Sequence, residues 1–349
     1  MSSKELNVAI VGTGIFASQA HLPNIEKVEG LKPYSAFNRT KSKAEKFAEL
    51  AKIDKSKVAD SLEEIFQDEN VDIVDALLPV QTNVEIVKMA IKHNKPLMFE
   101  KPIAANLKQA KEIVELSNST KLPISILEQW SYFSVIDTLK NDILPKIGDV
   151  IAFTHNATGA FNEANKYAST AWRMNPEHIG GYLSDGGVHQ LALLTGVLGE
   201  VDTISAQTKQ VRKESGTVDT LFSTLKLQNG IIGNFTYTSA LGATDKSTSL
   251  TIYGTNGSVV YDWSPSLPKP TITYQTGSSS QTASDKTVIE VNEVNAIQEE
   301  FKNFELAVSK NDKNLVGVKP ATAFHHLAII GAALDSAANN GDSIKVERV

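Results

Sequence analysis

Three short segments of the sequence carry the residues that could do chemistry. A glycine-rich run, Gly12-Thr13-Gly14-Ile15-Phe16-Ala17, follows an apolar segment near the start of the chain. A second segment reads Glu100-Lys101-Pro102, and a third places Asp185 four residues before His189. Glycines allow a backbone to approach phosphates, whereas lysine, histidine and a carboxylate can polarise an oxygen atom or move its proton. The segments therefore predict a nucleotide site and an acid–base site.

The glycine-rich run fits the pattern Gly-X-Gly-X-X-Gly/Ala, which binds a dinucleotide when it follows a strand and opens a helix. Gly12 permits a tight turn, Gly14 lets the backbone approach a pyrophosphate, and Ala17 allows close helix packing. We expect the intervening residues to line the cofactor as well, namely Thr13, Ile15 and Phe16. The alternative is a plain strand-to-helix turn that binds nothing.

The residues after the second predicted strand indicate which dinucleotide is bound. An acidic residue there would accept hydrogen bonds from the adenosine ribose, but this segment has Asn38 and Arg39 instead, with Lys43 one turn further on. An arginine can pair with a 2′-phosphate and stack on the adenine. The pattern favours NADP over NAD, and the alternative is a solvated basic helix start.

Composition excludes several other chemistries. The chain has 349 residues, no cysteine and a net charge of −6, with 41% hydrophobic residues. The absence of cysteine excludes thiolate nucleophiles and cysteine-ligated metals, and the negative charge argues against a nucleic-acid or membrane partner. No zinc-like spacing of ligands is present, so we expect no metal. No apolar stretch approaches the roughly 18 residues of a membrane span, so we expect a cytoplasmic protein.

The first third of the chain alternates strand-like and helix-like segments, which predicts a doubly wound parallel sheet. Six strands are expected: 7–11, 33–37, 57–59, 71–77, 96–99 and 123–127. Lys101 then follows the carboxyl end of the fifth strand, the edge at which open sheets of this kind bind ligands. Residues 77–83 follow the fourth predicted strand, which ends at the same edge of the sheet. We therefore expect Leu78 and Asn83 to lie near the nicotinamide.

Beyond Leu127 the pattern changes to an open, mostly antiparallel sheet with helices on one face. The pairs Asn229-Gly230 and Asn256-Gly257 predict hairpin turns, residues 264–286 predict exposed edge and loop, and helices are expected over 295–309 and 321–338. We therefore divide the chain into an NADP-binding domain, residues 1–127, and a substrate-binding and oligomerisation domain, residues 128–349. A polar stretch over 156–183 contains Trp172 and Arg173, which we expect to reach the cofactor.

The remaining histidines have weaker cases. His21, His93 and the pair His325-His326 lie on predicted helices and are expected to be structural. His155 and His178 lie in the predicted substrate segment, where a core role and a substrate role are equally supported.

Taken together, Gly12-X-Gly14, Glu100-Lys101-Pro102 and the segment from Gly180-Gly181 to His189 resemble the Gfo/Idh/MocA family of glucose–fructose oxidoreductase and inositol dehydrogenase type proteins. The resemblance covers essentially the whole chain. It is strongest to a fungal, cytoplasmic NADP-dependent branch, because Trp172-Arg-X-X-Pro-Glu-His178 runs into the Asp185/His189 segment.

The resemblance implies a role for each candidate residue. His189 would be the acid/base, Lys101 would hold the substrate oxygen and share proton transfer, Asp185 would bind or orient substrate, and Glu100 would lie near the cofactor ribose. Two segments depart from the family: Asn83 stands where many relatives have histidine, and Glu128-Gln129-Trp130 replaces a more usual arginine-containing turn. These departures leave the cofactor fold intact and the substrate open.

The leading hypothesis is an NADP(H)-dependent oxidoreductase that acts on a sugar, polyol or related carbonyl compound. A non-catalytic, NADP-sensing regulatory protein of the same fold is the alternative. A third hypothesis, redox-assisted glycoside cleavage with tightly held NAD, is disfavoured by Asn38-Arg39. Since family members commonly pair their open sheets, we expect a homodimer or a higher homo-oligomer.

Overall fold

The computed structural model of the chain describes residues 5–164 and 176–349. Of these, residues 5–132, 295–324 and 349 form one compact unit, and residues 133–164, 176–294 and 325–348 form a second. The second unit begins close to the predicted division after residue 127. Residues 295–324 were predicted to belong to the second domain, but they pack with the first unit. The helix in this segment buries Phe301 and Phe304 in the hydrophobic core of the first unit.

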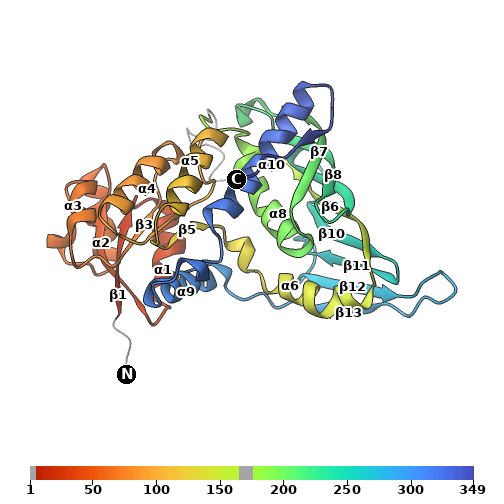
Figure 1. Cartoon of the computed structure of the whole chain (residues 1–349), viewed down its shortest axis with the longest axis horizontal. Coiled ribbons are helices and arrows are strands. Elements are labelled where there is room, and N and C mark those ends of the chain that lie inside the picture. Colours follow the sequence, from red (N-terminus) through yellow and green to blue (C-terminus); the bar gives the residue numbers. More distant parts are fainter. Residues whose placement is uncertain (1–4, 165–175) are drawn as a thin grey trace. The chain divides into compact units, whose positions relative to one another are not determined.

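The first unit is built on a five-stranded parallel sheet with the strand order β2-β1-β3-β4-β5 (Figure 1). Its strands are β1 Leu6–Val11, β2 Leu31–Phe37, β3 Ile73–Ala76, β4 Leu97–Glu100 and β5 Ile124–Leu127. β3 and β5 are buried along their whole length, as expected for parallel strands covered on both faces. The strand order reverses at β1, so ligand binding is expected at the carboxyl ends of β1 and β3.

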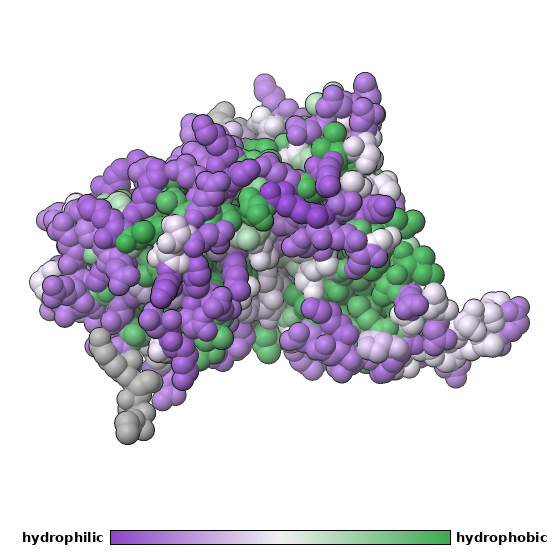
Figure 2. Space-filling view, in the orientation of Figure 1, coloured by the Kyte–Doolittle hydropathy of each residue, from purple (hydrophilic) through white to green (hydrophobic). Residues whose placement is uncertain are grey.

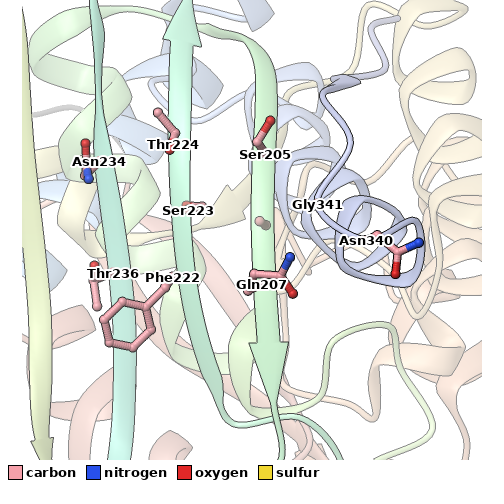
Figure 3. A pocket seen from close by; sticks show the side chains of 10 residues that line it. Ser205, Gln207, Phe222, Ser223, Thr224, Asn234, Thr236, Asn340 and Gly341 are labelled. Atoms are coloured by element: carbon pink, nitrogen blue, oxygen red, sulfur yellow. The ribbon is translucent and has the colours of Figure 1, made fainter.

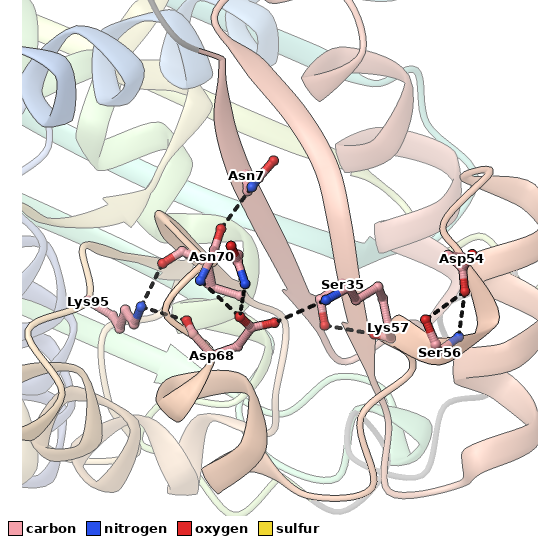
Figure 4. Close-up of polar contacts among 9 residues, drawn as sticks. Asn7, Ser35, Asp54, Ser56, Lys57, Asp68, Asn70 and Lys95 are labelled. Atoms are coloured by element: carbon pink, nitrogen blue, oxygen red, sulfur yellow. Dashed lines mark hydrogen bonds and ion pairs between the residues drawn. The ribbon is translucent and has the colours of Figure 1, made fainter.

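The predicted strand over residues 57–59 is wrong. Val58 makes only an isolated parallel bridge to Ala36. The preceding residues, Lys55–Lys57, form a 3-10 turn whose cap is Asp54, which accepts the Ser56 backbone N–H at 2.8 Å. This turn, drawn in Figure 4, leaves too few extended residues for a strand.

The helices of the first unit follow the predicted pattern, with one difference. They are η1 Ala17–His21, α1 Leu22–Ile25, α2 Lys41–Leu50, α3 Leu62–Gln67, η3 Val80–Thr82, α4 Asn83–Lys92, α5 Leu107–Asn118, η4 Gln129–Tyr132, α9 Ala296–Ser309 and η8 Lys313–Leu315. The helix expected after the glycine-rich run is a π-helical turn followed by one short α-helical turn. Ser61 caps α3, since its hydroxyl accepts the Glu64 N–H at 3.2 Å.

A polar network joins segments at the amino-terminal edge of this sheet (Figure 4). The Lys95 ammonium donates to the Asp68 carbonyl oxygen at 2.7 Å, and the Asn70 backbone N–H donates to the Asp68 carboxylate at 2.9 Å. Asn7, at the start of β1, donates its amide to the Asn70 carbonyl at 2.8 Å, and Lys57 pairs with Asp68 at 3.8 Å. These contacts fasten the amino-terminal edge of the sheet, whereas Gly12, Glu100 and Lys101 lie at the carboxyl edge.

The second unit contains a nine-stranded sheet with the order β13-β12-β11-β10-β6-β9-β8-β7-β14. Its strands are β6 Val150–Ala160, β7 Val201–Lys209, β8 Thr220–Leu227, β9 Ile232–Leu241, β10 Ser247–Gly254, β11 Gly257–Asp262, β12 Thr271–Thr276, β13 Thr287–Glu290 and β14 Ile344–Lys345. All neighbours are antiparallel except β6 and β9. The hairpins at Asn229-Gly230 and Asn256-Gly257 are confirmed, and the predicted fold class with them.

One loop prediction in this unit is wrong, and another polar stretch was taken to begin too early. The segment 264–286 contains β12, which pairs with β11 and buries Ile272 opposite Tyr261. The polar stretch beginning at Asn156 is strand up to Ala160, because alternate residues of β6 face the covered side of the sheet. Polar composition misled in both places, since threonine-rich strands with one exposed face look like loops.

Helices cover one face of the large sheet (Figure 1). The helical segments of the second unit include α6 Ser134–Asp137, η5 Thr138–Ile143, η6 Leu144–Lys146, α8 Tyr182–Leu198, η7 Lys213–Ser215 and most of α10 Pro320–Ala338. α8 and α10 are joined by a 2.9 Å hydrogen bond between Thr195 and His326, and His325 accepts the Val201 N–H at 3.0 Å. The predicted structural role of this histidine pair agrees with these contacts.

One helical stretch, residues 313–338, is long and apolar enough to cross a membrane by length and composition. The expectation that no segment approaches this length therefore has one exception. Most of its apolar window, 72%, is buried inside the protein, which is typical of a core helix.

Candidate active site

The glycine-rich run lies where β1, β2 and β3 end side by side. The Gly12 N–H donates to the Phe37 carbonyl at 2.9 Å, and a Cβ added at Gly12 would overlap the Leu77 carbonyl oxygen. Gly12 also has a φ of +94°, which an L side chain rarely adopts. Glycine is therefore required at this turn by both packing and backbone conformation.

The groups around this turn fit a dinucleotide. A Cβ at Gly14 would meet open space, so a ligand can approach its backbone. The Thr13 hydroxyl is buried and has no hydrogen-bond partner among the described residues, and Ile15 is 56% exposed although apolar. A buried hydroxyl without a partner is costly unless a ligand supplies one. Phe16, in contrast, is partly covered and contacts the His21 ring edge-on, with 5.2 Å between centroids.

Arg39 and Lys43 sit beside the carboxyl end of β2. Both are exposed, and neither side chain has an ion-pair or hydrogen-bond partner in the described parts of the chain. Asn38 is half-buried and its side-chain oxygen accepts the Thr40 N–H at 2.9 Å. Lys41, between them, is instead paired with Asp60. A cation pair at the end of β2 is thus available to an anionic group on the adenosine.

The turn after β3 supports the segment that carries Lys101. Asn83 is buried, and its side-chain amide donates to the carbonyl oxygens of Ile103 at 3.1 Å and Pro102 at 3.4 Å. Leu78 is half-buried just before this turn. The side-chain nitrogen of Asn83 therefore holds the backbone that follows Lys101. The predicted contact with the cofactor stays a prediction, and the side-chain oxygen of Asn83 is the atom that could make it.

Glu100 and Lys101 stand at the carboxyl end of β4. The Lys101 backbone N–H donates to the Leu127 carbonyl at 3.4 Å, and Lys101 is half-buried and has a further interaction partner. The Glu100 carboxylate lies 2.9 Å from Nε2 of His21, whose Nδ1 lies 2.8 Å from the Asp75 carboxylate. Burial alone would lower the pKa of His21, but the two carboxylates raise it to about 10. His21 is therefore an imidazolium at neutral pH.

Two more buried carboxyls adjoin this group. Glu128 and Glu300 are 1% and 2% exposed, and Glu128 accepts the Trp130 N–H at 3.1 Å. Burial, together with the carboxylates of Glu100 and Glu128, raises the pKa of Glu300 well above its usual range. This shift favours the protonated, uncharged form of the Glu300 carboxyl. The departure at Glu128-Gln129-Trp130 places a carboxyl beside Glu300.

Sequence reasoning missed the ion-pair chain Glu100–His21–Asp75. Asp75 was the signal: it is a charged residue inside the fully buried strand Ile73–Ala76, where a carboxylate needs a partner. Its partner is 54 residues away in sequence, so local patterns could not identify it.

In the second unit, α8 presents Asp185 and His189 on one face because they are four residues apart. Both are half-buried and have interaction partners. The helix starts after Gly180 and Gly181, which have φ values of +74° and +46°. A side chain at Gly181 would press on Pro176 at 2.9 Å, so these glycines set where the helix begins.

An aromatic pair supports this start of α8. The Tyr182 and Tyr237 rings stack at 5.2 Å with 14° between their planes. Gly186 lies directly against the Tyr237 hydroxyl, and an added Cβ there would overlap it. Lys101 belongs to the first unit, and Asp185 and His189 belong to the second.

The other candidate residues divide as follows. Trp172 and Arg173 lie outside the described residues. His155 is fully buried between Phe235 and Trp263, and burial lowers its pKa to about 3, which makes it a neutral core residue. His178 is 9% exposed. Among the described residues, no group of three or more histidines and acids could hold a metal ion.

Two family models match the chain. One, described as an oxidoreductase family with an NAD-binding Rossmann fold, matches residues 6–127. The other, described as the C-terminal alpha/beta domain of the oxidoreductase family, matches residues 142–346. Together they span nearly all of the two units.

Individual proteins agree with these matches. The chain is 51% identical to the uncharacterized protein YMR315W of Saccharomyces cerevisiae, over 98% of this chain and 99% of that protein. It is 26% identical to the D-apiose dehydrogenase of Rhizobium rhizogenes, over 74% of each chain. The crystal structure of an oxidoreductase from Thermotoga maritima matches with a TM-score of 0.85 and 30% identity, covering 98% of this chain and 99% of that one.

Proposed function

This chain belongs to the Gfo/Idh/MocA oxidoreductase family, and on that basis we propose that it is an NADP(H)-dependent oxidoreductase that acts on a sugar, polyol or related carbonyl compound. One observation carries the proposal. The open Gly12–Gly14 turn, the unpaired cations after β2 and the Glu100-Lys101 segment all lie at the carboxyl edge of one parallel sheet. That edge is where such sheets bind dinucleotides.

The proposed chemistry divides two tasks among three side chains. In the oxidative direction, a substrate carbon would lose a hydride and its hydroxyl a proton. A nicotinamide cofactor held at the Gly12–Gly14 turn would supply the hydride acceptor. His189 takes the proton, since histidine titrates near neutral pH. The Lys101 ammonium holds the substrate oxygen and stabilises its developing negative charge, and Asp185 orients the substrate. In reduction, His189 gives the proton back to the substrate oxygen, and Lys101 holds that oxygen as before.

The preference for NADP(H) is proposed from Arg39 and Lys43, and it can be measured. We expect Arg39→Ala to weaken NADPH binding by about 10- to 100-fold, the value of a charge-assisted contact, and to leave NADH binding nearly unchanged. Lys46→Ala is the matched control, because Lys46 is an exposed cation on α2, the helix that follows Arg39. Fluorescence titration with both cofactors gives the dissociation constants. Equal losses for NADPH and NADH would refute the assignment.

The sugar or polyol class of substrate is proposed with support from the D-apiose dehydrogenase relative. The test mixes purified protein and NADPH with a panel of aldoses, inosose-type ketones and simple aldehydes, and NADP⁺ with the corresponding alcohols. Turnover that disappears in His189→Ala supports the proposal. Tight NADPH binding without turnover across the panel would favour the alternative, a cofactor-sensing regulatory protein.

We also propose that the chain forms a homodimer or higher homo-oligomer through the open face of the nine-stranded sheet. α8 covers the opposite face, on which Tyr237 lies. The open face includes Phe222, which is 52% exposed beside a shallow depression lined by uncharged residues (Figure 3). The depression is lined by Ser205, Ala206, Gln207, Phe222, Ser223, Thr224, Asn234, Thr236, Asn340 and Gly341. Figure 2 shows hydrophobic surface where this sheet is drawn in Figure 1. Depletion of charge is typical of interface cores.

Sedimentation velocity tests this assembly. We expect a dimer or larger species at micromolar concentration, and we expect Phe222→Arg to convert it to monomer by placing a charge in the interface. Leu50→Arg is the control, because Leu50 is 56% exposed on α2 of the first unit. A monomeric wild-type protein, or a Phe222→Arg variant that remains assembled, would argue against this surface.

A further inference from the structure

The buried ion-pair chain Glu100–His21–Asp75 joins three separate elements of the first unit. His21 ends the π-helical turn Ala17–His21 that follows the Gly12–Gly14 turn. Its Nδ1 lies 2.8 Å from the Asp75 carboxylate in the middle of β3, and its Nε2 lies 2.9 Å from the Glu100 carboxylate at the end of β4. His21 therefore connects the cofactor turn to the residue directly before Lys101.

The surroundings hold the His21 ring in one orientation. His21 is 1% exposed, with Phe16 and Phe301 packed edge-on at centroid distances of 5.2 and 5.3 Å. The titratable groups that face it are Asp75 on β3, Glu100 at the end of β4 and Glu300 on α9. A π-helical turn inside or beside a helix is frequently retained for function, because it re-aims one side chain.

The side chain of Glu100 differs from the others in exposure. It is 18% exposed, whereas Asp75 and His21 are 0% and 1% exposed. Glu100 is thus the member of the chain that reaches the surface at the carboxyl edge of the sheet. The two ring nitrogens of His21 have separate tasks: Nδ1 anchors the ring to the sheet interior, and Nε2 holds the carboxylate that a ligand can touch.

We propose that His21 is a positioning residue for the cofactor site, whose imidazolium holds the Glu100 carboxylate in the orientation that receives the cofactor ribose. The inference rests on the proposed dinucleotide site. A buried imidazolium between two carboxylates gives short, charge-assisted hydrogen bonds, which fix direction better than neutral ones. Without the Nε2 contact, Glu100 turns toward solvent, and both NADPH and NADH bind more weakly.

Two isosteric replacements separate the tasks of the two nitrogens. The amide nitrogen of glutamine falls near Nε2 of histidine, whereas that of asparagine falls near Nδ1. His21→Gln therefore keeps a donor for Glu100, and His21→Asn loses it. Both are made together with Asp75→Asn, so that no buried carboxylate is left without its cation. Asp75→Asn alone keeps the contact between His21 and Glu100 and is the reference.

Cofactor affinity is the first readout. We expect His21→Asn in the Asp75→Asn background to weaken NADPH and NADH alike by about tenfold, the value of one charge-assisted contact, and His21→Gln to stay within about threefold of the reference. Val28→Ala is the stability control, because Val28 is buried in the hydrophobic core that also holds Phe301 and is not a member of the ion-pair chain. The control shows how much a loss of stability alone changes cofactor affinity. If the His21→Asn and His21→Gln proteins bind NADPH and NADH with equal affinity once this effect is allowed for, the positioning role is overturned.

The charge of the ring is the second readout, and it needs no cofactor. Nitrogen-15 NMR of labelled histidine, assigned by comparison with the His21→Gln protein, reports both ring nitrogens directly. We expect both to be protonated at pH 8 in the wild-type protein. A neutral ring at that pH would overturn the proposal even if the protein binds NADPH. A wild-type protein that binds neither cofactor but contains the charged ring would instead overturn the proposed function, and the cofactor role of His21 would fail with it.

Discussion

Lys101→Met should lower kcat by about 10²- to 10⁴-fold, the range associated with loss of a positioned proton donor or acceptor. Methionine retains most of the length of the lysine stem and removes the ammonium, so the packing at the end of β4 is kept. The backbone N–H of residue 101 still donates to the Leu127 carbonyl, at 3.4 Å in the wild-type protein. NADPH affinity should change much less than kcat, because the proposed partner of Lys101 is the substrate oxygen.

The measurement is steady-state oxidation of NADPH on the substrate found in the panel, together with fluorescence titration of the cofactor. Lys108→Met is the control, since Lys108 is exposed on α5 near the same segment. A Lys101→Met protein that keeps more than about a tenth of the wild-type kcat would contradict the proposed role. His189→Ala, measured in parallel and combined with Lys101→Met, indicates which side chain carries the proton. Non-additive losses are expected if the two act as a unit.

The residues at the carboxyl edge of the parallel sheet could be predicted because each belongs to a short motif that directly follows a strand in the sequence. Gly12 and Gly14 follow an apolar strand, and Glu100-Lys101-Pro102 follows another. Parallel strands point their carboxyl ends the same way, so two separate motifs had to meet at one edge. The hairpin glycines Gly230 and Gly257, with φ values of +88° and +142°, were equally local signals.

The ion-pair chain beneath that edge was not predictable, because it is made by long-range contacts. His21 lies on a predicted helix and reads as an ordinary core histidine, and its two partners are 54 and 79 residues away. Glu300 lies on α9, near the end of the sequence. The predicted domain division had assigned this helix to the other domain. A sequence pattern describes one segment of the chain. The partner of a buried charge depends on which distant segments pack against it in the fold.

The same limit explains why α9 was located correctly but assigned to the wrong neighbours. Its start at Asn295 carries a capping signal, since the Asn295 side chain accepts the Gln298 N–H at 3.3 Å. Its packing depends on Phe301 and Phe304, which share a core with Ile25 and Phe47 of the first unit. Apolar residues specify that a helix has a buried face, and they do not specify the partner of that face.

Gly186→Ala should impair the enzyme more than Gly187→Ala, although the two glycines are adjacent on α8. An added Cβ at Gly186 would overlap the Tyr237 hydroxyl, whereas one at Gly187 would meet the Tyr237 ring at 3.4 Å, an ordinary contact. Tyr237 cannot easily move aside, because it is 8% exposed and stacked on Tyr182. The strain therefore falls on the first turn of α8, which carries Asp185.

We expect Gly186→Ala to lower the free energy of unfolding by about 1–3 kcal/mol, the usual cost of overpacking, and kcat by up to about 100-fold, as for an ångström-scale misplacement of a catalytic group. Gly187→Ala should be neutral, or more stable by up to about 1 kcal/mol, because alanine is the better helix former. Chemical denaturation and steady-state kinetics on both proteins test this. If the two substitutions have equal effects on kcat, the start of α8 does not position the chemistry. If Gly186→Ala lowers the free energy of unfolding but leaves kcat unchanged, the contact with Tyr237 supports the fold and is not needed to position Asp185.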